Sequence, residues 1–188
     1  MDYGREIAKR GLEIGAIKLR PQDPFTWAKG DRMPIYNDNR MFLWDHENRE
    51  LIVNGLKNIS DQLGFTVVAG TSTAGIPHGA VLADRLKAPF VYIRDKPKDH
   101  GLKNQIEGID ADKGLEGVVL VVEDLISTGG SSAAAVQAVR NAGAQCYHCI
   151  SIFNYGFDKA VDMFKGERPF DNEGTKRLNP PCNVHSLL

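Results

Sequence analysis

The sequence has few cysteines, no long apolar run and almost no excess of charge, and each shortage excludes a class of protein. Three cysteines in 188 residues are too few for a disulfide framework, and their odd number favours a reducing compartment. No apolar run approaches the ~20 residues that cross a bilayer, and the amino-terminal stretch lacks the apolar centre of a signal peptide. A formal net charge of −1 argues against a protein that coats nucleic acid or anionic membrane. We therefore expect a cytoplasmic protein without nucleic-acid or membrane partners.

Two of the cysteines, Cys146 and Cys149, have the spacing of a metal-binding or redox pair. Their stretch, AQCYHCISIF, is typical of a strand, in which positions three apart point to opposite faces. No second cysteine pair stands at zinc spacing. We interpret both as structural residues.

From residue 65 onward, apolar runs typical of strands alternate with amphipathic stretches typical of helices. Strands are expected at 65–70, 89–94, 118–122 and 145–153, and helices at 75–87 and 129–142. This alternation predicts an α/β fold with an open, mainly parallel sheet flanked by helices, in a single domain over residues 1–188. Ligands of such folds bind beyond the carboxyl ends of the strands.

The segments outside this alternation are expected to be smaller elements. A helix is predicted within residues 3–18, a β-hairpin within 25–40 that turns at residues 29–31, and a helix that ends at Gly64. The polar stretch 95–114 has almost no apolar periodicity, which indicates a mobile loop over a ligand. The tail is expected to be irregular until a short edge strand in CNVHSLL.

The stretch VVLVVEDLISTGGSS, residues 118–132, contains two acidic residues followed by a run of small residues that suits an anion, so its two parts make opposite electrostatic demands on a ligand. Glu123 and Asp124 follow an apolar strand, and paired carboxylates at such an edge accept hydrogen bonds from hydroxyls or hold a cation. The small residues after them open a helix, whose amino terminus and exposed N–H groups favour a phosphate. A ribose 5-phosphate satisfies both demands.

Two other segments have features that suit phosphate. GTSTAG, residues 70–75, has the glycine spacing of a P-loop but lacks the following Lys-Ser/Thr, so it predicts a phosphate-approaching turn and not a nucleoside triphosphatase. The stretch after residue 93 carries several cations, which suit a departing pyrophosphate. They are Arg94, Lys96, Lys98, His100 and Lys103.

With these motifs the sequence resembles the type I phosphoribosyltransferases and, among them, the orotate phosphoribosyltransferase family. VVLVVEDLISTGGSS is similar to the phosphoribosyl-diphosphate (PRPP) signature, and FTWAKGDRMPIYNDNR, GTSTAGIPHGAVLADRL and YIRDKPKDHGLKNQIEG also resemble family segments. The resemblance implies transfer of phosphoribosyl from PRPP to orotate in pyrimidine synthesis. It also implies Mg²⁺ held mainly by PRPP, and a homodimer in which Arg94 reaches the partner's site.

The resemblance further implies roles for individual residues. Glu123 and Asp124 would hold the ribose hydroxyls, and Lys98 and His100 would act as catalytic residues on the leaving pyrophosphate. The other expected PRPP contacts are Arg94, Thr71, Ser72, Thr73, Leu125, Ile126, Ser127, Thr128, Gly129, Gly130 and Ser131. Orotate would meet Ser127, Lys29 and Tyr36 beneath a hood of about residues 20–45, and residues 95–114 would form a mobile lid.

Some positions depart from the family pattern, and two alternatives remain open. Ala28 stands where some members have lysine, IFNYGF lacks an arginine found in others, and the chain ends earlier than most. One alternative is a phosphoribosyltransferase for purines or other bases, against which the hood and lid sequences argue. The other is a non-catalytic PRPP sensor, which has little need of Lys98 and His100 and usually carries a basic face.

Overall fold

The computed structural model describes residues 1–27, 30–96, 105–110, 113–165 and 178–188, and its main feature is a six-stranded sheet. The strand order is β10-β9-β8-β5-β6-β7. The strands span Asn183–Ser186 (β10), Gln145–Asn154 (β9), Val118–Ile126 (β8), Val67–Thr71 (β5), Phe90–Ile93 (β6) and Ile106–Glu107 (β7). All neighbours pair in parallel except β6 and β7. The predicted fold class, an open and mainly parallel sheet flanked by helices, is confirmed.

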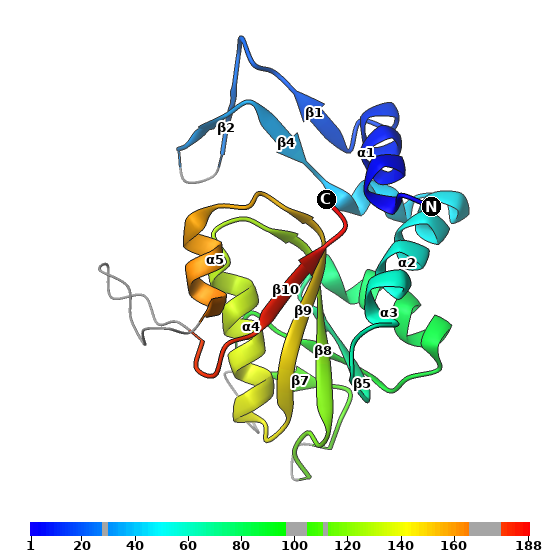
Figure 1. Ribbon diagram of the computed structural model, residues 1–188, viewed down its shortest axis with the longest axis vertical. Helices are drawn as coiled ribbons and strands as arrows, with labels where there is room; N and C mark the ends of the chain where they lie inside the picture. Colours follow the sequence, from blue (N-terminus) through cyan, green and yellow to red (C-terminus); the bar gives the residue numbers. More distant parts are fainter. Residues whose placement is uncertain (28–29, 97–104, 111–112, 166–177) are drawn as a thin grey trace.

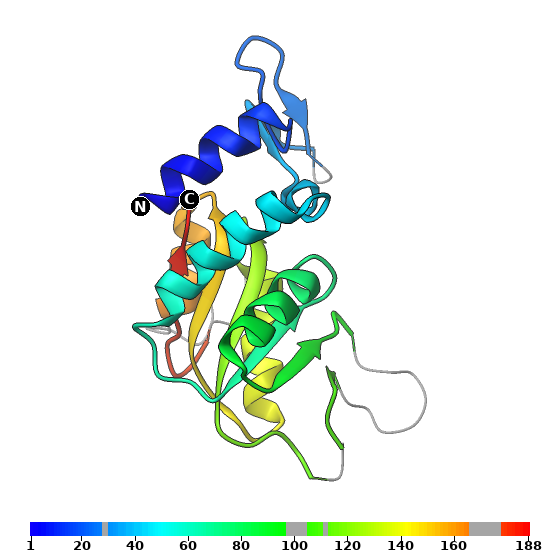
Figure 2. The ribbon, with the colours of Figure 1, turned by 90° about the vertical axis from the view of Figure 1, so that its right-hand side faces the viewer.

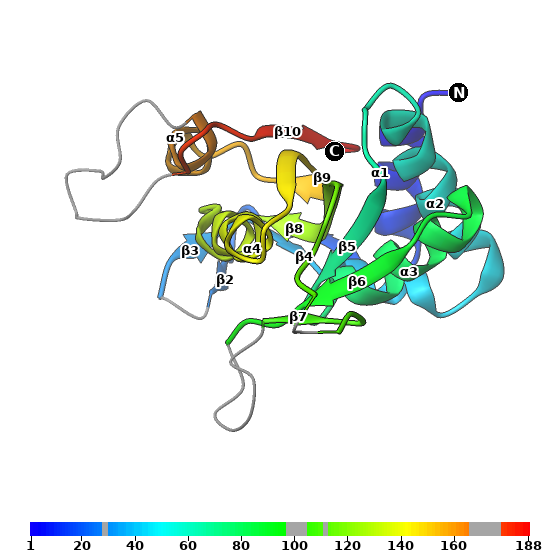
Figure 3. The same ribbon diagram turned by 90° about the horizontal axis from the view of Figure 1, so that it is seen from below.

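Helices cover both faces of this sheet because its central strands are apolar on both faces. Leu120 and Val122 of β8 pack in one core cluster, and Val119 and Val121 pack in the other. The first cluster lies under α2 (His46–Ser60) and α3 (Gly75–Leu86), and the second under α4 (Gly130–Asn141) and α5 (Asp158–Lys165). Figure 3 shows these two pairs of helices on opposite sides of the strands. Alternate side chains of one strand therefore build two cores.

The amino-terminal part forms a small hood above the carboxyl edge of the sheet (Figure 1). It contains α1 (Tyr3–Glu13) and two small antiparallel sheets, one of β1 (Ile17–Leu19) with β4 (Ile35–Asn37), the other of β2 (Phe25–Thr26) with β3 (Arg32–Met33). The 3₁₀ helix η1 (Asn39–Leu43) leads back to α2 (Figure 2). The predicted hairpin is present as β2–β3, but the helix expected within 3–18 ends at Glu13, and the strand at 17–19 was not predicted.

Three further elements differ from the sequence-based expectation. Strand β8 runs to Ile126, so Glu123 and Asp124 lie within the strand and not beyond its end. Strand β7 lies inside the stretch expected to be a mobile loop, where Ile106 is 2% exposed. Helix α5 occupies a region for which no helix was expected. The expected edge strand near the carboxyl terminus is present as β10.

Among the described residues, none of the helices has the length and apolarity needed to cross a membrane.

Candidate active site

Glu123 is a buried carboxyl group at the centre of the carboxyl edge of the sheet. It is 6% exposed, and its Oε1 accepts hydrogen bonds from Thr71 Oγ1 at 2.7 Å and from the backbone N–H of Asp124 at 3.0 Å. Its Oε2 accepts a hydrogen bond from Ser132 Oγ at 3.0 Å. Burial raises the pKa of Glu123 to about 8, although the Thr71 hydrogen bond opposes this shift. Glu123 therefore ties β5, β8 and α4 together as well as facing the ligand edge.

Asp124 is the more accessible member of the acid pair. Its carbonyl oxygen accepts a hydrogen bond of 2.7 Å from Nδ2 of Asn39, which is 1% exposed and stands at the start of η1. The position of the second acid is thus fixed from the hood side. Sequence reasoning missed Asn39 because NDN is ordinary turn chemistry, and nothing local shows that its amide reaches a residue 85 positions away.

The loop after β8 leads directly into the amino terminus of α4. Gly129 has a φ of +80°, and a Cβ there would lie 3.1 Å from the Cα of Ala160, so only glycine suits this position. In the part of the chain that the structure describes, no side chain caps α4. An uncapped helix start with Ser127, Thr128 and Ser131 around it is suited to a phosphate.

A cavity of about 370 Å³, here called the sheet-edge cavity, opens between β5, β6 and β8. It is lined by all three acidic or basic side chains that we expected to meet PRPP and that the structure describes, which are Arg94, Glu123 and Asp124. Thr71, Ser72, Leu125 and Ser131 line it as well. Thr73 is not among its lining residues. Ile126 is fully buried in the core below α4.

Arg94 forms an ion pair that the sequence did not indicate. Its Nη1 lies 3.5 Å from Oε1 of Glu107, which stands on the neighbouring strand β7. The pair was missed because β7 was not predicted, and this antiparallel strand brings Glu107 beside the end of β6. Both side chains remain partly exposed, at 37% and 22%, so this ion pair contributes little to stability.

A second cavity, of about 690 Å³, lies between the hood and the ends of β8 and β9, and is here called the hood cavity. Its walls include Trp27, Tyr36, Arg32, Ser127 and Tyr155. The rings of Trp27 and Tyr155 lie 4.7 Å apart, and Tyr155 stacks on Phe157 at 5.6 Å. Aromatic walls with a few polar groups suit a flat heterocycle. Leu125 lines both cavities, so the two meet at the end of β8.

Burial also raises the pKa of the Tyr155 hydroxyl to about 12, so this wall stays neutral at physiological pH. Asn37 lines the same cavity, and both polar atoms of its side-chain amide are buried without a hydrogen-bond partner among the described residues. The aromatic residues Tyr155 and Phe157 were not predicted, since they follow β9 and meet the hood only in the folded chain.

Three predicted site residues, Lys29, Lys98 and His100, lie outside the described residues. Of the other orotate contacts, Ser127 and Tyr36 both line the hood cavity. Of the other phosphate contacts, Thr128 lines the hood cavity, while Gly129 and Gly130 form the start of α4. The interpretation of Cys146 and Cys149 as structural agrees with their burial as free thiols in the core. The expectation that they point to opposite faces was wrong, since both pack in the same core cluster, and the register of β9 with β8 shifts at this point.

The fold and the acid pair above an uncapped helix define a class, and comparison with known proteins agrees with it. Residues 43–169 match the family model described as phosphoribosyl transferase domain. Orotate phosphoribosyltransferase of Cytophaga hutchinsonii is 48% identical over 167 residues, which cover 88% of this chain and 78% of that protein. The enzyme of the same name from Streptococcus thermophilus is 49% identical over 168 residues, 87% of this chain and 78% of that one.

A solved structure gives the same relationship. The crystal structure of orotate phosphoribosyltransferase from Aeropyrum pernix superposes with a TM-score of 0.73 at 26% identity, covering 96% of this chain and 92% of that one. The chain belongs to the orotate phosphoribosyltransferase family, within the phosphoribosyltransferase class.

Proposed function

We infer that this chain transfers the phosphoribosyl group of PRPP to orotate, which gives orotidine 5′-monophosphate and pyrophosphate in pyrimidine synthesis. The observation that carries this function is the meeting of two unlike cavities at Leu125. One is aromatic and suits a planar base, and the other is polar and contains the acid pair. The names of relatives at 48–49% identity support the same reaction.

The reaction places most of its demands on positioning and charge. The bond from the anomeric carbon to the pyrophosphate oxygen breaks with its electron pair on pyrophosphate. A bond to a ring nitrogen of orotate forms, and this nitrogen gives up its proton to the pyrophosphate or to water. Asp124 and Glu123 would hold the sugar while positive charge develops on its ring. The start of α4 would fix the 5-phosphate, and Lys98 and His100 would stabilise the leaving group. Catalysis would then come from orientation and electrostatic stabilisation.

We also propose that Mg²⁺ assists by neutralising the pyrophosphate. Mg²⁺ prefers oxygen ligands and keeps several waters, so substrate phosphates suit it better than a cage of side chains. The oxygens of Glu123 already accept hydrogen bonds from Thr71, Ser132 and the Asp124 backbone. The metal ligands would therefore come mainly from PRPP and water.

The working unit that we propose is a homodimer in the cytoplasm, with Arg94 near the neighbouring subunit's PRPP. This rests on the family resemblance and on the place of Arg94, whose side chain is 37% exposed at the rim of the sheet-edge cavity. Arginine recognises phosphate through two parallel hydrogen bonds, which suits such a rim.

The reaction is tested by following the loss of orotate absorbance with PRPP and Mg²⁺ present. We expect turnover with orotate and none with adenine or hypoxanthine. Turnover with a purine but not with orotate would replace this function by purine salvage. Tight PRPP binding without turnover of any base would favour a sensor.

A further inference from the structure

The turn Asp38–Arg40 connects the hood to the core and lies against the acid pair. Asn39, in its middle, is 1% exposed, and its side chain donates to the carbonyl of Asp124 in β8 at 2.7 Å. Because this buried residue is tied to β8, the flanking side chains, Asp38 and Arg40, start from a fixed backbone.

The guanidinium group of Arg40 is oriented by Asp38. Arg40 Nε lies 2.7 Å from Asp38 Oδ1, and Nη2 lies 2.8 Å from Oδ2, so the two groups meet as a two-pronged pair. The backbone N–H of Arg40 also donates to Asp38 Oδ1, at 3.2 Å. The Arg40 side chain is 64% exposed, and ion pairs this exposed contribute little to stability. What the pair fixes is the direction of the guanidinium.

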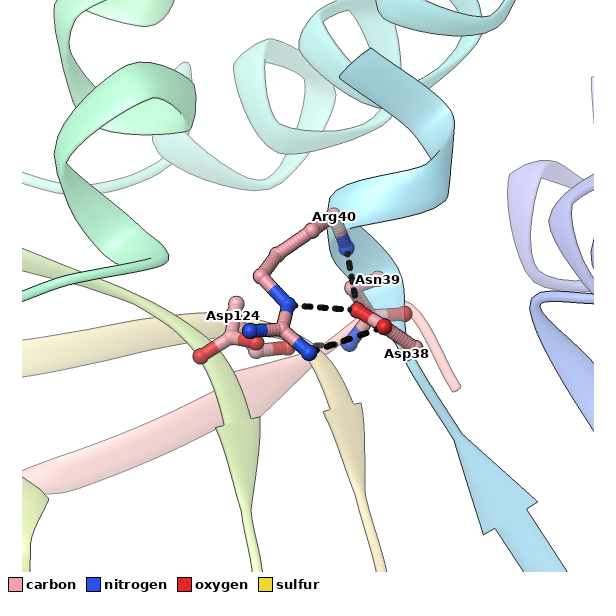
Figure 4. Close-up of polar contacts among 4 residues, drawn as sticks. All are labelled: Asp38, Asn39, Arg40 and Asp124. Carbon is pink, nitrogen blue, oxygen red and sulfur yellow. Dashed lines mark hydrogen bonds and ion pairs between the residues drawn. The ribbon is translucent and has the colours of Figure 1, made fainter. Parts of the chain in front are cut away.

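That direction leads to the second acid of the pair. Figure 4 shows the guanidinium of Arg40 between the carboxylate of Asp38 and the side chain of Asp124. The hydrogen bonds to Asp38, followed by smaller charge effects that include Asp124, raise the pKa of Arg40. Asp38 engages Nε and Nη2, which leaves Nη1 unused by this pair.

The sheet-edge cavity needs such a cation. Among the described residues, its lining contains three acidic side chains, Asp95, Glu123 and Asp124, and one basic side chain, Arg94. Arg94 is itself paired with Glu107. A positive charge beside the Asp124 carboxylate would reduce its repulsion of a substrate with several phosphates. Arg40 supplies this charge from outside the cavity lining.

We propose that Arg40, aligned by Asp38, is a positioning residue for Asp124, which orients that carboxylate toward the sugar hydroxyls and offsets its repulsion of the substrate's phosphates. The inference rests on the proposed function for the identity of the sugar phosphate. The turn Asp38–Arg40 also links the hood to the acid pair, so that the base site and the sugar site keep a fixed position relative to each other.

The test measures PRPP binding by calorimetry, with Mg²⁺ present, and steady-state kinetics in the same variants. Arg40→Gln should raise the Kd and the KM for PRPP roughly ten-fold, the loss typical of one hydrogen bond to a charged group, while kcat changes less. Arg40→Lys keeps the charge without the fork and should recover part of the affinity. Arg85→Gln is the matched control, since Arg85 pairs with Glu50 far from the site and should leave PRPP affinity unchanged.

Asp38→Asn separates positioning from general structural damage. If Asp38 acts through Arg40, the double variant with Arg40→Gln should bind PRPP no worse than Arg40→Gln alone. Additive losses, or unchanged PRPP affinity in Arg40→Gln, would overturn the proposal, as would a loss that Arg40→Lys does not reduce. Wild-type protein that binds PRPP but does not consume orotate would refute the proposed reaction and still allow this test. Wild-type protein that does not bind PRPP would refute both.

Discussion

Glu123 shows how one residue can serve both the fold and the ligand. A carboxyl group that is 6% exposed would be costly as an anion, and its hydrogen bonds from Thr71, Ser132 and the Asp124 backbone offset only part of that cost. The sequence shows two acids after an apolar run, and from it both appear equivalent. Only the packing of α4 and β5 around β8 makes Glu123 the buried acid and leaves Asp124 nearer the opening.

This burial predicts how stability depends on pH. The pKa of Glu123 is about 8 in the folded chain, against a usual value of 4.5, so between these values the folded state holds a proton that the unfolded state has released. The contribution of Glu123 to stability therefore falls as pH rises through this window, and the full penalty is present above about 8. Glu123→Gln cannot ionise and should escape the penalty.

Thermal unfolding followed by circular dichroism from pH 5 to pH 9 measures this effect. We expect the Tm of Glu123→Gln to lie close to that of the wild type at pH 5 and increasingly above it toward pH 8, while PRPP affinity falls. Two curves that stay parallel over this range would mean that Glu123 is ionised in the folded protein throughout.

At the scale of elements, the sequence predicts those helices and strands whose pattern lies within the element itself, and it does not predict features that depend on distant contacts. The strands β5, β6 and β9 and the helices α3 and α4 follow from apolar periodicity and glycine punctuation. Strand β8 continues past the acids because polar groups on β5 and α4 satisfy Glu123, which no local pattern shows. Helix α5 does have buried residues at helical spacing, Ala160, Met163 and Phe164, and that signal was present in the sequence.

The candidate site was predictable to a similar degree. The acid pair and the phosphate loop lie in one contiguous motif, so sequence places them together. The hood cavity was harder to predict, since Trp27 of the hood meets Tyr155 and Phe157 only after folding. Likewise, the sequence presents Asn39 and Arg40 as ordinary turn residues, and only the folded structure places them beside Asp124 of β8.

The contact between hood and core gives a prediction about the base site. The ring of Trp27 lies 4.7 Å from that of Tyr155, and Trp27 Nε1 donates to the carbonyl of Ile35 at 3.3 Å, so this residue holds one wall of the hood cavity. Trp27→Ala should raise the KM for orotate roughly ten-fold, as expected for the loss of a packed aromatic pair, with less effect on the KM for PRPP.

Trp44→Ala is the control for this change, because Trp44 is 90% exposed and does not line the hood cavity. Its kinetic constants should match those of the wild type. Equal rises of both KM values in Trp27→Ala would show that the hood supports the whole site and not the base pocket in particular.

At the scale of the whole molecule, the site lies between three parts of one chain. The sheet supplies the acid pair, the hood supplies the aromatic wall, and the segment after β6 begins with Arg94 at the rim. In this chain Arg94 contacts Glu107, so an arginine that serves a neighbouring subunit would have to share or leave that partner. A partly exposed ion pair is weak enough to allow the exchange.

A dimer with shared sites predicts recovery of activity in mixtures. Arg94→Ala and Lys98→Ala should each be nearly inactive, but a mixed dimer contains one site that keeps both side chains if Arg94 acts across the interface. Equal mixing with free subunit exchange makes half of the dimers mixed, so activity should return to about a quarter of the wild-type value. The measurement is orotate consumption before and after exchange, with each parent alone as the control. Activity that never exceeds either parent would show that Arg94 and Lys98 of one chain both serve the same site, so that the two residues do not complete a site across the interface.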